Sequence, residues 1–490
     1  MVLVSERDGD SGVAWDVELG ASAPTCGNGN IDAGEQCDGA NLGGQTCVSR
    51  GYASGALSCS STCQFDESPC VPLTGCGNGL IDTGEQCDGN NLSGQTCALQ
   101  GFDGGTLTCA GNCLAFDTSG CFQCGDGVCS PNETAPICAS DCAATAVSAG
   151  STHTCALLAS SGAVCFGDNS FGELGDGTNN NSNVPVPVST LSGATTISAG
   201  VDHSCAVVSG STLCWGHNDG GQLGDSTNNN SILPVTVVGL SNTTTVVAAN
   251  TYTCALFGGG SAACWGWNYG GQLGDGTNND SNVPVTVSGL PGALALAAYD
   301  VHTCALLTGG SVACWGWNSD GQLGDGTHNS SNTPVTVLGV SNAVDIAVGG
   351  GHTCVVLTTG SVLCWGRNYW GQLVDGTWTE RTVAVSVLGV ADAIAVDAGY
   401  DHTCAIRAGG AAICWGDNGE GQLGNGTIVE SNVPVTVTGV STATDISGGD
   451  GQSCAVLASG GLACWGSSYF GERGDGTNSN SDVPVTVSGF

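Results

Sequence analysis

The chain has 490 residues, enough for two or more domains with a sizeable core, and 82 of them are glycine. Its formal net charge at pH 7 is −37, with six arginines and no lysine. Such a chain repels phosphate backbones and anionic lipid surfaces, so we expect no nucleic-acid binding. The sequence has no apolar run of about 18 residues, so we expect no membrane insertion either.

The cysteine count indicates the compartment. Thirty cysteines are unusual in a reducing cytosol, so we expect an extracellular or cell-surface location. Residues 1–25 are polar and acidic and lack the basic start and apolar stretch of a signal peptide. We interpret them as a polar leader or linker. Either a signal has been removed or the chain is a fragment of a longer one.

Three cysteine-rich modules follow. Residues 26–70 begin with CGNGNIDAGEQCDGANLGGQTC, residues 76–121 begin with CGNGLIDTGEQCDGNNLSGQTC, and residues 124–142 read CGDGVCSPNETAPICASDC. Each module has an even number of cysteines, so each can close its own disulfides. Modules this small, with few large apolar side chains, need such bridges for stability. The spacing alone does not choose among the possible pairings.

The motif CGNG-x-x-D-x-GEQCDG-x-N resembles the cysteine-rich disulfide repeats of secreted and surface proteins from myxobacteria and related bacteria. The resemblance implies a bacterial protein in a secreted or surface setting, with a stapled spacer or binding module and no catalysis. Zinc is disfavoured because no histidine lies nearby. Calcium remains an alternative, because carboxylates and amides cluster in IDAGEQCDGAN and IDTGEQCDGNN.

Residues 143–490 contain seven copies of a segment of about fifty residues, a period typical of solenoids and propellers. Each copy divides into four strand-like pieces, as in ATTISAG, HSCAVV, STLCWG and LPVTVVG of the second copy. Small residues at the end of the first piece suit a crowded central axis. The proline of the fourth piece suits a sheet edge. We therefore predict an all-β chain with a seven-bladed β-propeller of four-stranded blades, preceded by small disulfide-rich modules.

Each copy also carries two cysteines, on the second and third pieces, that bracket a short turn. We predict that they form one hairpin disulfide per blade, a loop of about ten residues that is worth roughly 2.5–3 kcal/mol in the chain-entropy model. The pairs are Cys155 with Cys165, Cys205 with Cys214, Cys254 with Cys264, Cys304 with Cys314, Cys354 with Cys364, Cys404 with Cys414, and Cys454 with Cys464.

The fourth copy, HTCALLTGGSVACWGWNSDGQLGDGT, resembles the repeat of the regulator of chromosome condensation family. The resemblance implies a seven-bladed β-propeller. It leaves function open, because the family includes a nucleotide-exchange factor, a plant ultraviolet receptor and a secreted bacterial β-lactamase inhibitory protein. This chain lacks the basic segments of the chromatin-binding member and the Trp–Arg motif of the receptor. Its cysteine pairs place it nearest to the secreted inhibitor in setting.

Residues that recur in every copy are expected to serve the fold. We interpret the histidines as structural hydrogen-bond donors between strand and loop, the tryptophans of the CWG motif as packing between blades, and the aspartates of GQLGDGT as turn formers. Calcium at these aspartates is a weaker alternative, and we otherwise expect no cofactor. The residues concerned are His153, His203, His302, His352 and His402; Trp215, Trp265, Trp315, Trp365, Trp415 and Trp465, with Phe166 in the first copy; and Asp176, Asp225, Asp275, Asp325, Asp375 and Asp475.

Positions that vary between copies are better candidates for function, because the fold does not demand them. Equivalent loops of the third to fifth copies carry aromatic residues and an arginine, the types that dominate binding interfaces. The candidate partner-binding residues are Trp267, Tyr269, Trp317, Arg367, Tyr369, Trp370 and Trp378. The competing interpretation is that these rings only cover neighbouring loops.

The sequence predicts a binding protein and no enzyme, because no Ser–His–Asp elbow, phosphate loop or zinc-protease motif is present. The expected partner is an extracellular protein, bound for adhesion, scaffolding or inhibition. A glycan stacked on the same aromatic residues is the first alternative. An enzyme with a site at the central channel is the second. The oligomeric state is not indicated.

Overall fold

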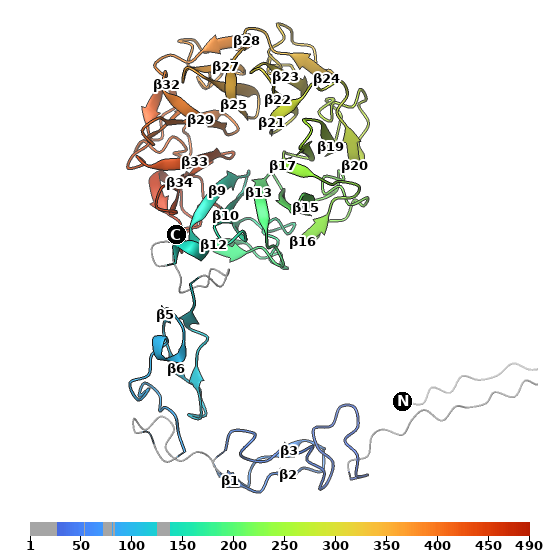
Figure 1. Cartoon of the computed structure of the whole chain (residues 1–490), viewed down its shortest axis with the longest axis vertical. Coiled ribbons are helices and arrows are strands. Elements are labelled where there is room, and N and C mark those ends of the chain that lie inside the picture. The colour runs from blue at the N-terminus through green and yellow to red at the C-terminus, as the bar shows by residue number, and fades with distance from the viewer. Residues whose placement is uncertain (1–26, 53, 72–80, 82–83, 125–137) are drawn as a thin grey trace, which may run out of the picture. The chain divides into compact units, whose positions relative to one another are not determined.

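A computed structural model describes residues 27–52, 54–71, 81, 84–124 and 138–490 (Figure 1). The chain divides into two compact units, with the division between Phe122 and Gln123. The short cysteine-rich segment at 124–142 therefore falls in the same unit as the repeats that follow it. None of the described helices is long and apolar enough to cross a membrane.

The first unit contains two small modules of the same design, each built from two-stranded ribbons and loops. The strands are β1 (Ser54–Gly55) paired with β4 (Cys70–Val71) and β2 (Ser58–Cys59) with β3 (Phe65–Asp66), then β5 (Gly104–Gly105) with β8 (Cys121–Phe122) and β6 (Thr108–Cys109) with β7 (Phe116–Asp117). A single 3₁₀ turn, η1 (Ala98–Gln100), lies in the second module.

The disulfide pattern, which the sequence left open, is the same in both modules. Cys37 is bonded to Cys59 and Cys47 to Cys70 in the first, as Cys87 is to Cys109 and Cys97 to Cys121 in the second. The second cysteine of each module thus pairs with the fourth, and the third pairs with the sixth. No described cysteine is free. In the first module, the bridge between Cys47 and Cys70 and the side chain of Leu57 form a small buried core.

The second unit begins with a disulfide between Cys124 and Cys138 and a one-turn helix, α1 (Ala139–Cys142). Seven four-stranded antiparallel sheets, here called blades 1 to 7, follow around a central axis (Figure 1). Blades 1 to 3 comprise β9 (Ala144–Ala149), β10 (His153–Leu158), β11 (Ala163–Gly167), β12 (Ser182–Pro187); β13 (Ala194–Ala199), β14 (His203–Val208), β15 (Ser211–Gly216), β16 (Ser231–Thr236); and β17 (Thr243–Ala248), β18 (Tyr252–Phe257), β19 (Ala262–Gly266), β20 (Ser281–Thr286).

Blades 4 to 7 repeat the same order. They comprise β21 (Ala293–Ala298), β22 (His302–Leu307), β23 (Val312–Gly316), β24 (Ser331–Thr336); β25 (Ala343–Val348), β26 (His352–Leu357), β27 (Val362–Gly366), β28 (Arg381–Ser386); β29 (Ala393–Ala398), β30 (His402–Arg407), β31 (Ala412–Gly416), β32 (Ser431–Thr436); and β33 (Ala443–Gly448), β34 (Gln452–Leu457), β35 (Leu462–Gly466), β36 (Ser481–Thr486). The predicted fold class is confirmed, with the small-residue strand innermost and the proline strand at the outer edge.

The ring closes without exchange of a strand, because each blade is built from consecutive strands of one repeat. Blades 1 and 7 are joined by hydrogen bonds and packing. The Gly476 amide donates to the Asn183 carbonyl at 2.8 Å, and the Val147 amide donates to the Asp445 carboxylate at 2.9 Å. Apolar side chains of both blades share one buried cluster around Phe166.

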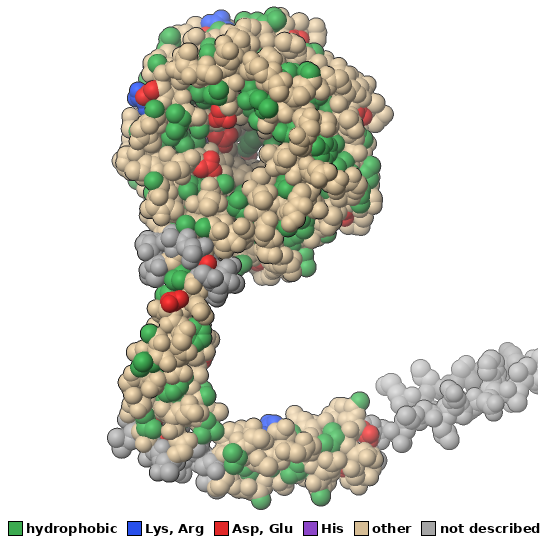
Figure 2. Space-filling model, in the orientation of Figure 1, with side chains coloured by type: hydrophobic (Ala, Val, Ile, Leu, Met, Phe, Trp, Pro, Cys, Tyr) green, Lys and Arg blue, Asp and Glu red, His purple; other side chains and the backbone are tan. Residues whose placement is uncertain are grey.

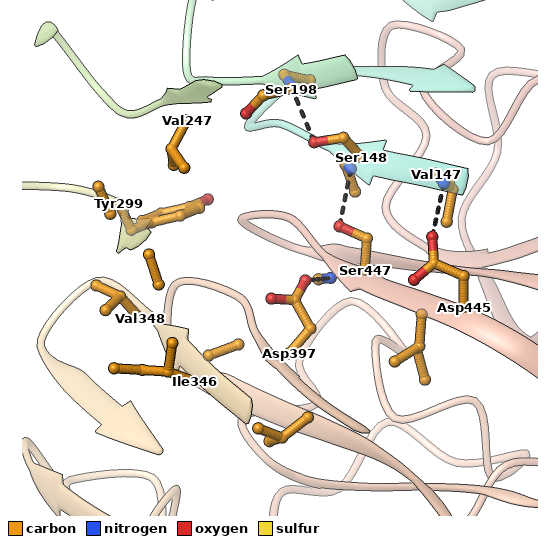
Figure 3. Close-up of a pocket in the computed structure, with 18 of the residues that line it drawn as sticks. Val147, Ser148, Ser198, Val247, Tyr299, Ile346, Val348, Asp397, Asp445 and Ser447 are labelled. Carbon is orange, nitrogen blue, oxygen red and sulfur yellow. Dashed lines mark hydrogen bonds between the residues drawn. The ribbon is translucent and has the colours of Figure 1, made fainter. Parts of the chain in front are cut away.

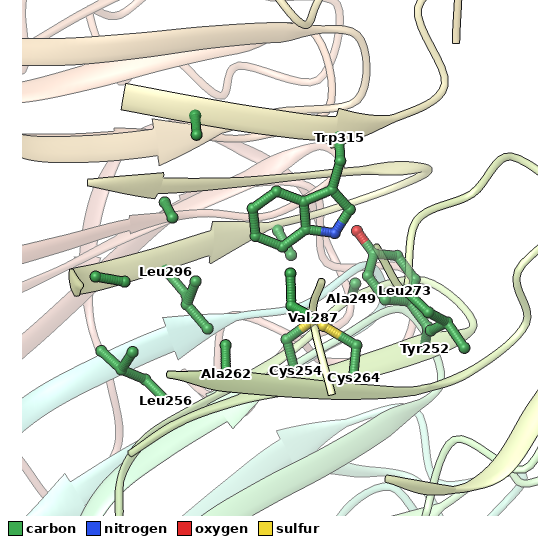
Figure 4. Close-up of a cluster of buried hydrophobic side chains, with 14 of the residues drawn as sticks. Ala249, Tyr252, Cys254, Leu256, Ala262, Cys264, Leu273, Val287, Leu296 and Trp315 are labelled. Carbon is green, nitrogen blue, oxygen red and sulfur yellow. A yellow bond between two sulfur atoms is a disulfide. The ribbon is translucent and has the colours of Figure 1, made fainter. Parts of the chain in front are cut away.

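The recurring tryptophans pack between blades, as predicted. Trp315 of β23 is fully buried against Cys254, Leu273 and Val287 of the preceding blade (Figure 4). Its Nε1 donates a hydrogen bond of 2.9 Å to the carbonyl of Gln272, also in the preceding blade. Blades 2 to 7 all repeat this bond. The tryptophan therefore fixes each blade to its neighbour through both apolar area and a directed hydrogen bond.

The cysteine pairs are also confirmed. Cys304 and Cys314 lie directly opposite each other on β22 and β23 and form a disulfide, and the other six blades have the equivalent bridge. The hairpin turn sets this register. The first turn residue after β22 is Thr308, and Gly309 and Gly310 follow it with positive φ values of 92° and 78°. Glycine adopts this region without steric cost, which allows the tight reversal that aligns the two sulfurs.

The histidines hold neighbouring blades together, and here the sequence interpretation needs one correction. Their partner is a hydroxyl on the second strand of the next blade, where we had expected a loop. The Nε2 of His302 lies 2.9 Å from the Thr353 hydroxyl, and that hydroxyl donates to the Gln322 carbonyl. Since the hydroxyl proton is used there, the imidazole is the donor. Burial lowers the pKa of His302 to about 3, so the ring is neutral at pH 7.

Candidate binding face and central channel

Two rings of loops emerge at one end of the propeller, because the strands that precede them run in the same direction. The first and third strands of a blade run the same way, because each is antiparallel to the second strand between them. The loop after β21, residues 299–301, and the loop after β23, residues 317–330, therefore emerge at the same end of blade 4. We call this end of the propeller the loop face. Its inner loops are those that follow the first strand of each blade, and its outer loops are those that follow the third strand. Every candidate partner-binding residue lies on it.

The outer loops of this face are held by their own hydrogen bonds. Asn318 is fully buried, and its Oδ1 accepts from the Leu323 amide at 2.9 Å while its Nδ2 donates to the Thr327 carbonyl at 3.1 Å. Asp325 accepts from the Thr327 amide at 2.9 Å. The aspartate is thus occupied as a turn former, and the loop offers a fixed platform for the variable side chains that it displays.

Three of the predicted aromatic residues form a continuous exposed row. The ring centroids of Trp267 and Tyr269 are 6.4 Å apart, and those of Tyr269 and Trp317 are 6.3 Å apart. The row bridges blades 3 and 4. The exposed fractions are 41% for Trp267, 54% for Tyr269 and 39% for Trp317. Large rings are usually buried, so a row that is half exposed in two adjacent blades is a candidate contact surface.

The other predicted residues are distributed unevenly. Tyr369, Trp370 and Trp378 are exposed on blade 5, and no ring contact joins them to the row. Arg367 is not displayed as expected. Its guanidinium lies between two carboxylates, 3.0 Å from Asp320 and 3.6 Å from Asp401, with a fifth of the side chain exposed. The structure also exposes Tyr469 of blade 7, which sequence reasoning missed although it occupies the same position as Tyr269.

The variable residues form pairs across blade boundaries. Phe171 lies against His217 with ring centroids 4.4 Å apart, and Asp320 pairs with Arg367. Trp267 lies so close to Gly220 that an added Cβ would meet its ring at 2.1 Å. The second residue after the loop asparagine of one blade therefore determines which side chain fits just before the loop asparagine of the next blade. This supports the competing interpretation in part: the rings do cover neighbouring loops, but they keep large exposed areas.

The inner loops of the same face are acidic. Asp202, Asp300, Asp401 and Asp450 lie on the short loops that follow β13, β21, β29 and β33. Tyr299 reaches from blade 4 across to blade 7, where its hydroxyl donates to Asp450. Asp450 also accepts from the Ser151 hydroxyl of blade 1 at 2.6 Å. The first of these bonds connects blades on opposite sides of the ring over the end of the central channel, and the second joins the neighbouring blades 7 and 1.

The channel itself encloses about 300 Å³ and is lined by the innermost strands of the blades (Figure 3). Most of the residues that line it are aliphatic, but the surface they expose to the channel is mainly polar, and Asp345, Asp397 and Asp445 lie on the innermost strands of blades 5 to 7. Each accepts a backbone amide from the next blade at 2.9 Å. The space-filling view shows acidic side chains gathered at the mouth of the channel (Figure 2). Sequence reasoning did not single out these carboxylates. The sequence pattern that could have indicated them is an aspartate on the innermost strand, at a position where most copies have a small or apolar residue.

Buried carboxylates give the propeller a defined pH dependence. Burial raises the pKa of Asp397 from 3.8 to about 7, and burial likewise raises the pKa values of Glu173 to about 7 and Asp401 to about 6. A group whose pKa is higher in the folded state stabilises the fold when protonated, and this contribution is lost as the pH rises through the folded-state pKa. Stability should therefore fall from about pH 4, where the carboxyls of the unfolded chain ionise, to about pH 7, where those of the folded chain ionise.

We predict that Asp397→Asn reduces this loss. Asparagine can still accept the Gly448 amide bond but carries no charge to bury. After discounting for partial exposure, the substitution should gain about 1–2 kcal/mol at pH 8 relative to wild type and little at about pH 3, where the carboxyl is protonated in both the folded and the unfolded chain. Calorimetric unfolding at both pH values measures it. A variant with the same pH dependence as wild type would contradict the assignment.

No group of three or more metal-ligating side chains comes together within the described ranges. The carboxylates considered for calcium have other partners. Asp38 accepts hydrogen bonds from the Gly27 and Gly29 amides, and the aspartates of the outer loops accept hydrogen bonds from backbone amides of the same loop, as Asp275 does from Thr277. The arginines of the described ranges are likewise paired with carboxylates. The loop face therefore presents aromatic rings and uncompensated negative charge.

Family models agree with the repeat. The regulator of chromosome condensation (RCC1) repeat matches residues 164–207, 209–256, 260–306, 309–356 and 409–456, and a second model of the same repeat matches 144–173, 294–322, 343–372 and 393–422. Together the matches span more than half of the chain. The chain belongs to the regulator of chromosome condensation repeat family. A sequence search of curated proteins finds no match.

Solved structures share the propeller fold. Human WBSCR16 is 21% identical, with a TM-score of 0.57 over 63% of this chain and 85% of its own. Prp20p of Saccharomyces cerevisiae is 20% identical, with a TM-score of 0.59 over 70% of this chain and 87% of its own. Yeast RCC1 (Prp20) in complex with Kap60 gives 20% identity and a TM-score of 0.60 over 70% and 85%. At this identity the similarity concerns the propeller fold.

Proposed function

We propose that this protein is a secreted or cell-surface bacterial binding protein that recognises another extracellular protein through the loop face of its propeller. The observation that carries the proposal is the exposed row Trp267–Tyr269–Trp317, which spans two blades on rigid loops. Tryptophan and tyrosine supply large contact areas at low cost in conformational entropy, and they dominate binding energy where they cluster. Adhesion, scaffolding and inhibition of an extracellular enzyme are the roles that such a surface suits.

The setting is supported by the disulfides. A bridge in each of the seven blades and the bridges of the amino-terminal modules indicate an oxidising, extracellular environment. The modules themselves resemble repeats of secreted and surface proteins. We propose that they act as a stapled spacer or a second binding module before the propeller.

A protein partner is supported by the relatives. The structure of yeast RCC1 (Prp20) has been solved with Kap60 bound, and that of Prp20p is reported together with its binding to Gsp1p and histones. We propose for this chain a protein partner of its own, because an identity of 20% to these structures carries the fold alone. A glycan stacked on the same rings is the alternative, since aromatic rows also suit sugar faces.

We propose no catalysis and no resident cofactor. The three channel carboxylates each bind a backbone amide of the next blade, which gives them a structural role. Screening for hydrolase activity tests this part of the proposal. Activity that is lost in Asp345→Asn or Asp445→Asn would establish the enzyme alternative.

The binding test replaces the exposed rings. Trp267→Ala, Trp317→Ala and Trp370→Ala combined should reduce capture of a cell-surface partner by at least about tenfold, because such anchors are typically worth 2 kcal/mol or more each. The control is Leu294→Ala, Val344→Ala and Ile394→Ala, which removes exposed apolar side chains near the start of the innermost strands, on the opposite face. Equal capture by wild type and the tryptophan variant would refute the proposed face. A glycan array distinguishes a sugar ligand.

A further inference from the structure

The charges around the aromatic row indicate what kind of partner it fits. The inner loops place Asp202, Asp300, Asp401 and Asp450 inside the ring of outer loops on the same face. Asp300 lies close enough to affect Tyr269: burial, followed by the negative charge of Asp300, raises the pKa of the Tyr269 hydroxyl. The aromatic row, on the outer loops of blades 3 and 4, and the acidic inner loops therefore belong to the same face of the propeller.

The basic groups of this surface are few, and each already has an acidic partner. Arg367 is paired with Asp320 and Asp401, and His217, which lies near Asp202, has its Nε2 3.3 Å from the Asp219 carboxylate. The histidines of the second strands are buried and neutral, with pKa values lowered to about 3 or 4 by burial. The chain has no lysine at all.

The acidic loops also repel one another. Burial raises the pKa values of Asp202, Asp300 and Asp401. The charge of His217, a hydrogen bond from Asn250 and the charge of Arg367, respectively, oppose this rise, and neighbouring carboxylates add to it more weakly. For Asp202 and Asp300 the neighbours include Asp450. A raised carboxylate pKa means that the site stabilises the charged form poorly on its own. A cation bound among these groups would relieve both the desolvation and the repulsion.

Aromatic rings add a second attraction for the same kind of partner. A lysine or arginine side chain within about 6 Å of a tryptophan or tyrosine ring is attracted by the π-face, most strongly where water is excluded. Trp267, Tyr269 and Trp317 lie on the outer loops of the same face and keep large exposed areas. An anionic partner would meet the same surface at an electrostatic penalty.

We infer that the partner of the loop face presents a cationic segment, rich in lysine or arginine, whose side chains stack on the Trp267–Trp317 row while their charges meet the inner aspartates. The inference rests on the proposed function and adds the chemical class of the partner. Long-range attraction from a chain of net charge −37 then accelerates encounter, and the aromatic row sets the docking position.

The test uses fluorescein-labelled octa-arginine with the full-length protein, and octa-glutamate and a glycine–serine octamer as control peptides. Wild type should bind octa-arginine with an affinity that falls as salt rises, and should bind neither control peptide. Asp300→Asn with Asp401→Asn, and separately Trp267→Ala with Trp317→Ala, should each weaken binding about five- to thirtyfold. Asparagine at 300 can still accept the bond from Asn250, and asparagine at 401 can still accept the bond from Gln372; thermal unfolding verifies that the fold is preserved.

The matched control removes the same number of charges elsewhere. Asp103→Asn with Asp117→Asn, both exposed in the first unit, should change the affinity less than twofold. Equal weakening by this control would show diffuse attraction to a polyanion and would overturn the inference. Absence of octa-arginine binding would overturn it as well. The proposed function would still stand in that case if the tryptophan triple variant lost capture of its surface partner, and would fail if that variant captured the partner normally.

Discussion

Breaking the seven hairpin disulfides is expected to unfold the propeller at room temperature. Each bridge closes a loop with a sequence separation of 9 or 10, worth about 2.5–3 kcal/mol in the chain-entropy model. The losses do not simply add, but three or four of them reach the range of about 5–15 kcal/mol that holds a typical domain folded. The propeller blades also share their clusters with neighbours, so damage in one blade weakens the next.

The experiment must reduce the protein in denaturant, since the blade cysteines are fully buried in the fold and shielded from reductant. After alkylation and removal of denaturant, circular dichroism should show no cooperative thermal transition. The single-bridge variant Cys304→Ala with Cys314→Ala provides the graded control and should lose only about 3 kcal/mol. A reduced and alkylated propeller that melts within a few degrees of wild type would show that the bridges are dispensable.

Trp315→Ala should destabilise the propeller by about 3–5 kcal/mol, the usual cost of removing a fully buried large ring. The substitution leaves a cavity between blades 3 and 4 and removes the donor to the Gln272 carbonyl. That carbonyl still accepts from the Thr303 hydroxyl, so it is not left without a partner. The measurement is the free energy of unfolding from a denaturant titration.

Trp267→Ala is the matched control, because the same residue type is 41% exposed there. It should cost less than about 1 kcal/mol, and the difference between the two substitutions isolates the contribution of packing between blades. Similar costs at both positions would contradict the assignment of Trp315 to the core and Trp267 to the surface.

Much of the fold was predictable because the sequence signals for strands, turns and cysteine pairs recur in seven copies. The period gave the number of blades, the proline gave the outer strand, and the spacing of Cys304 and Cys314 around Thr308–Gly310 gave the hairpin pair. Each of these signals is local in sequence, and strand register follows from turn length.

The candidate site was less predictable, because its properties depend on contacts between repeats. Arg367 looked like an exposed contact residue, yet Asp320 of the preceding blade holds it. The link from Tyr299 to Asp450 joins residues 151 positions apart, and no local pattern indicates it. The disulfide pairing in the two amino-terminal modules could not be predicted either. Apart from the cysteines, their sequences carry no strand or turn pattern that sets which cysteines meet.

The account depends most on which face of the ring meets the partner, and oxidative footprinting measures this directly. Hydroxyl radicals modify exposed tryptophan rings, so the partner-bound and free proteins are compared by mass spectrometry at Trp267, Trp317 and Trp370. Fully buried Trp315 serves as the unreactive reference. The predicted result is protection of these three rings, with Leu294, Val344 and Ile394 on the opposite face unchanged. Protection of the opposite face alone, with the tryptophans oxidised as in the free protein, would contradict the account.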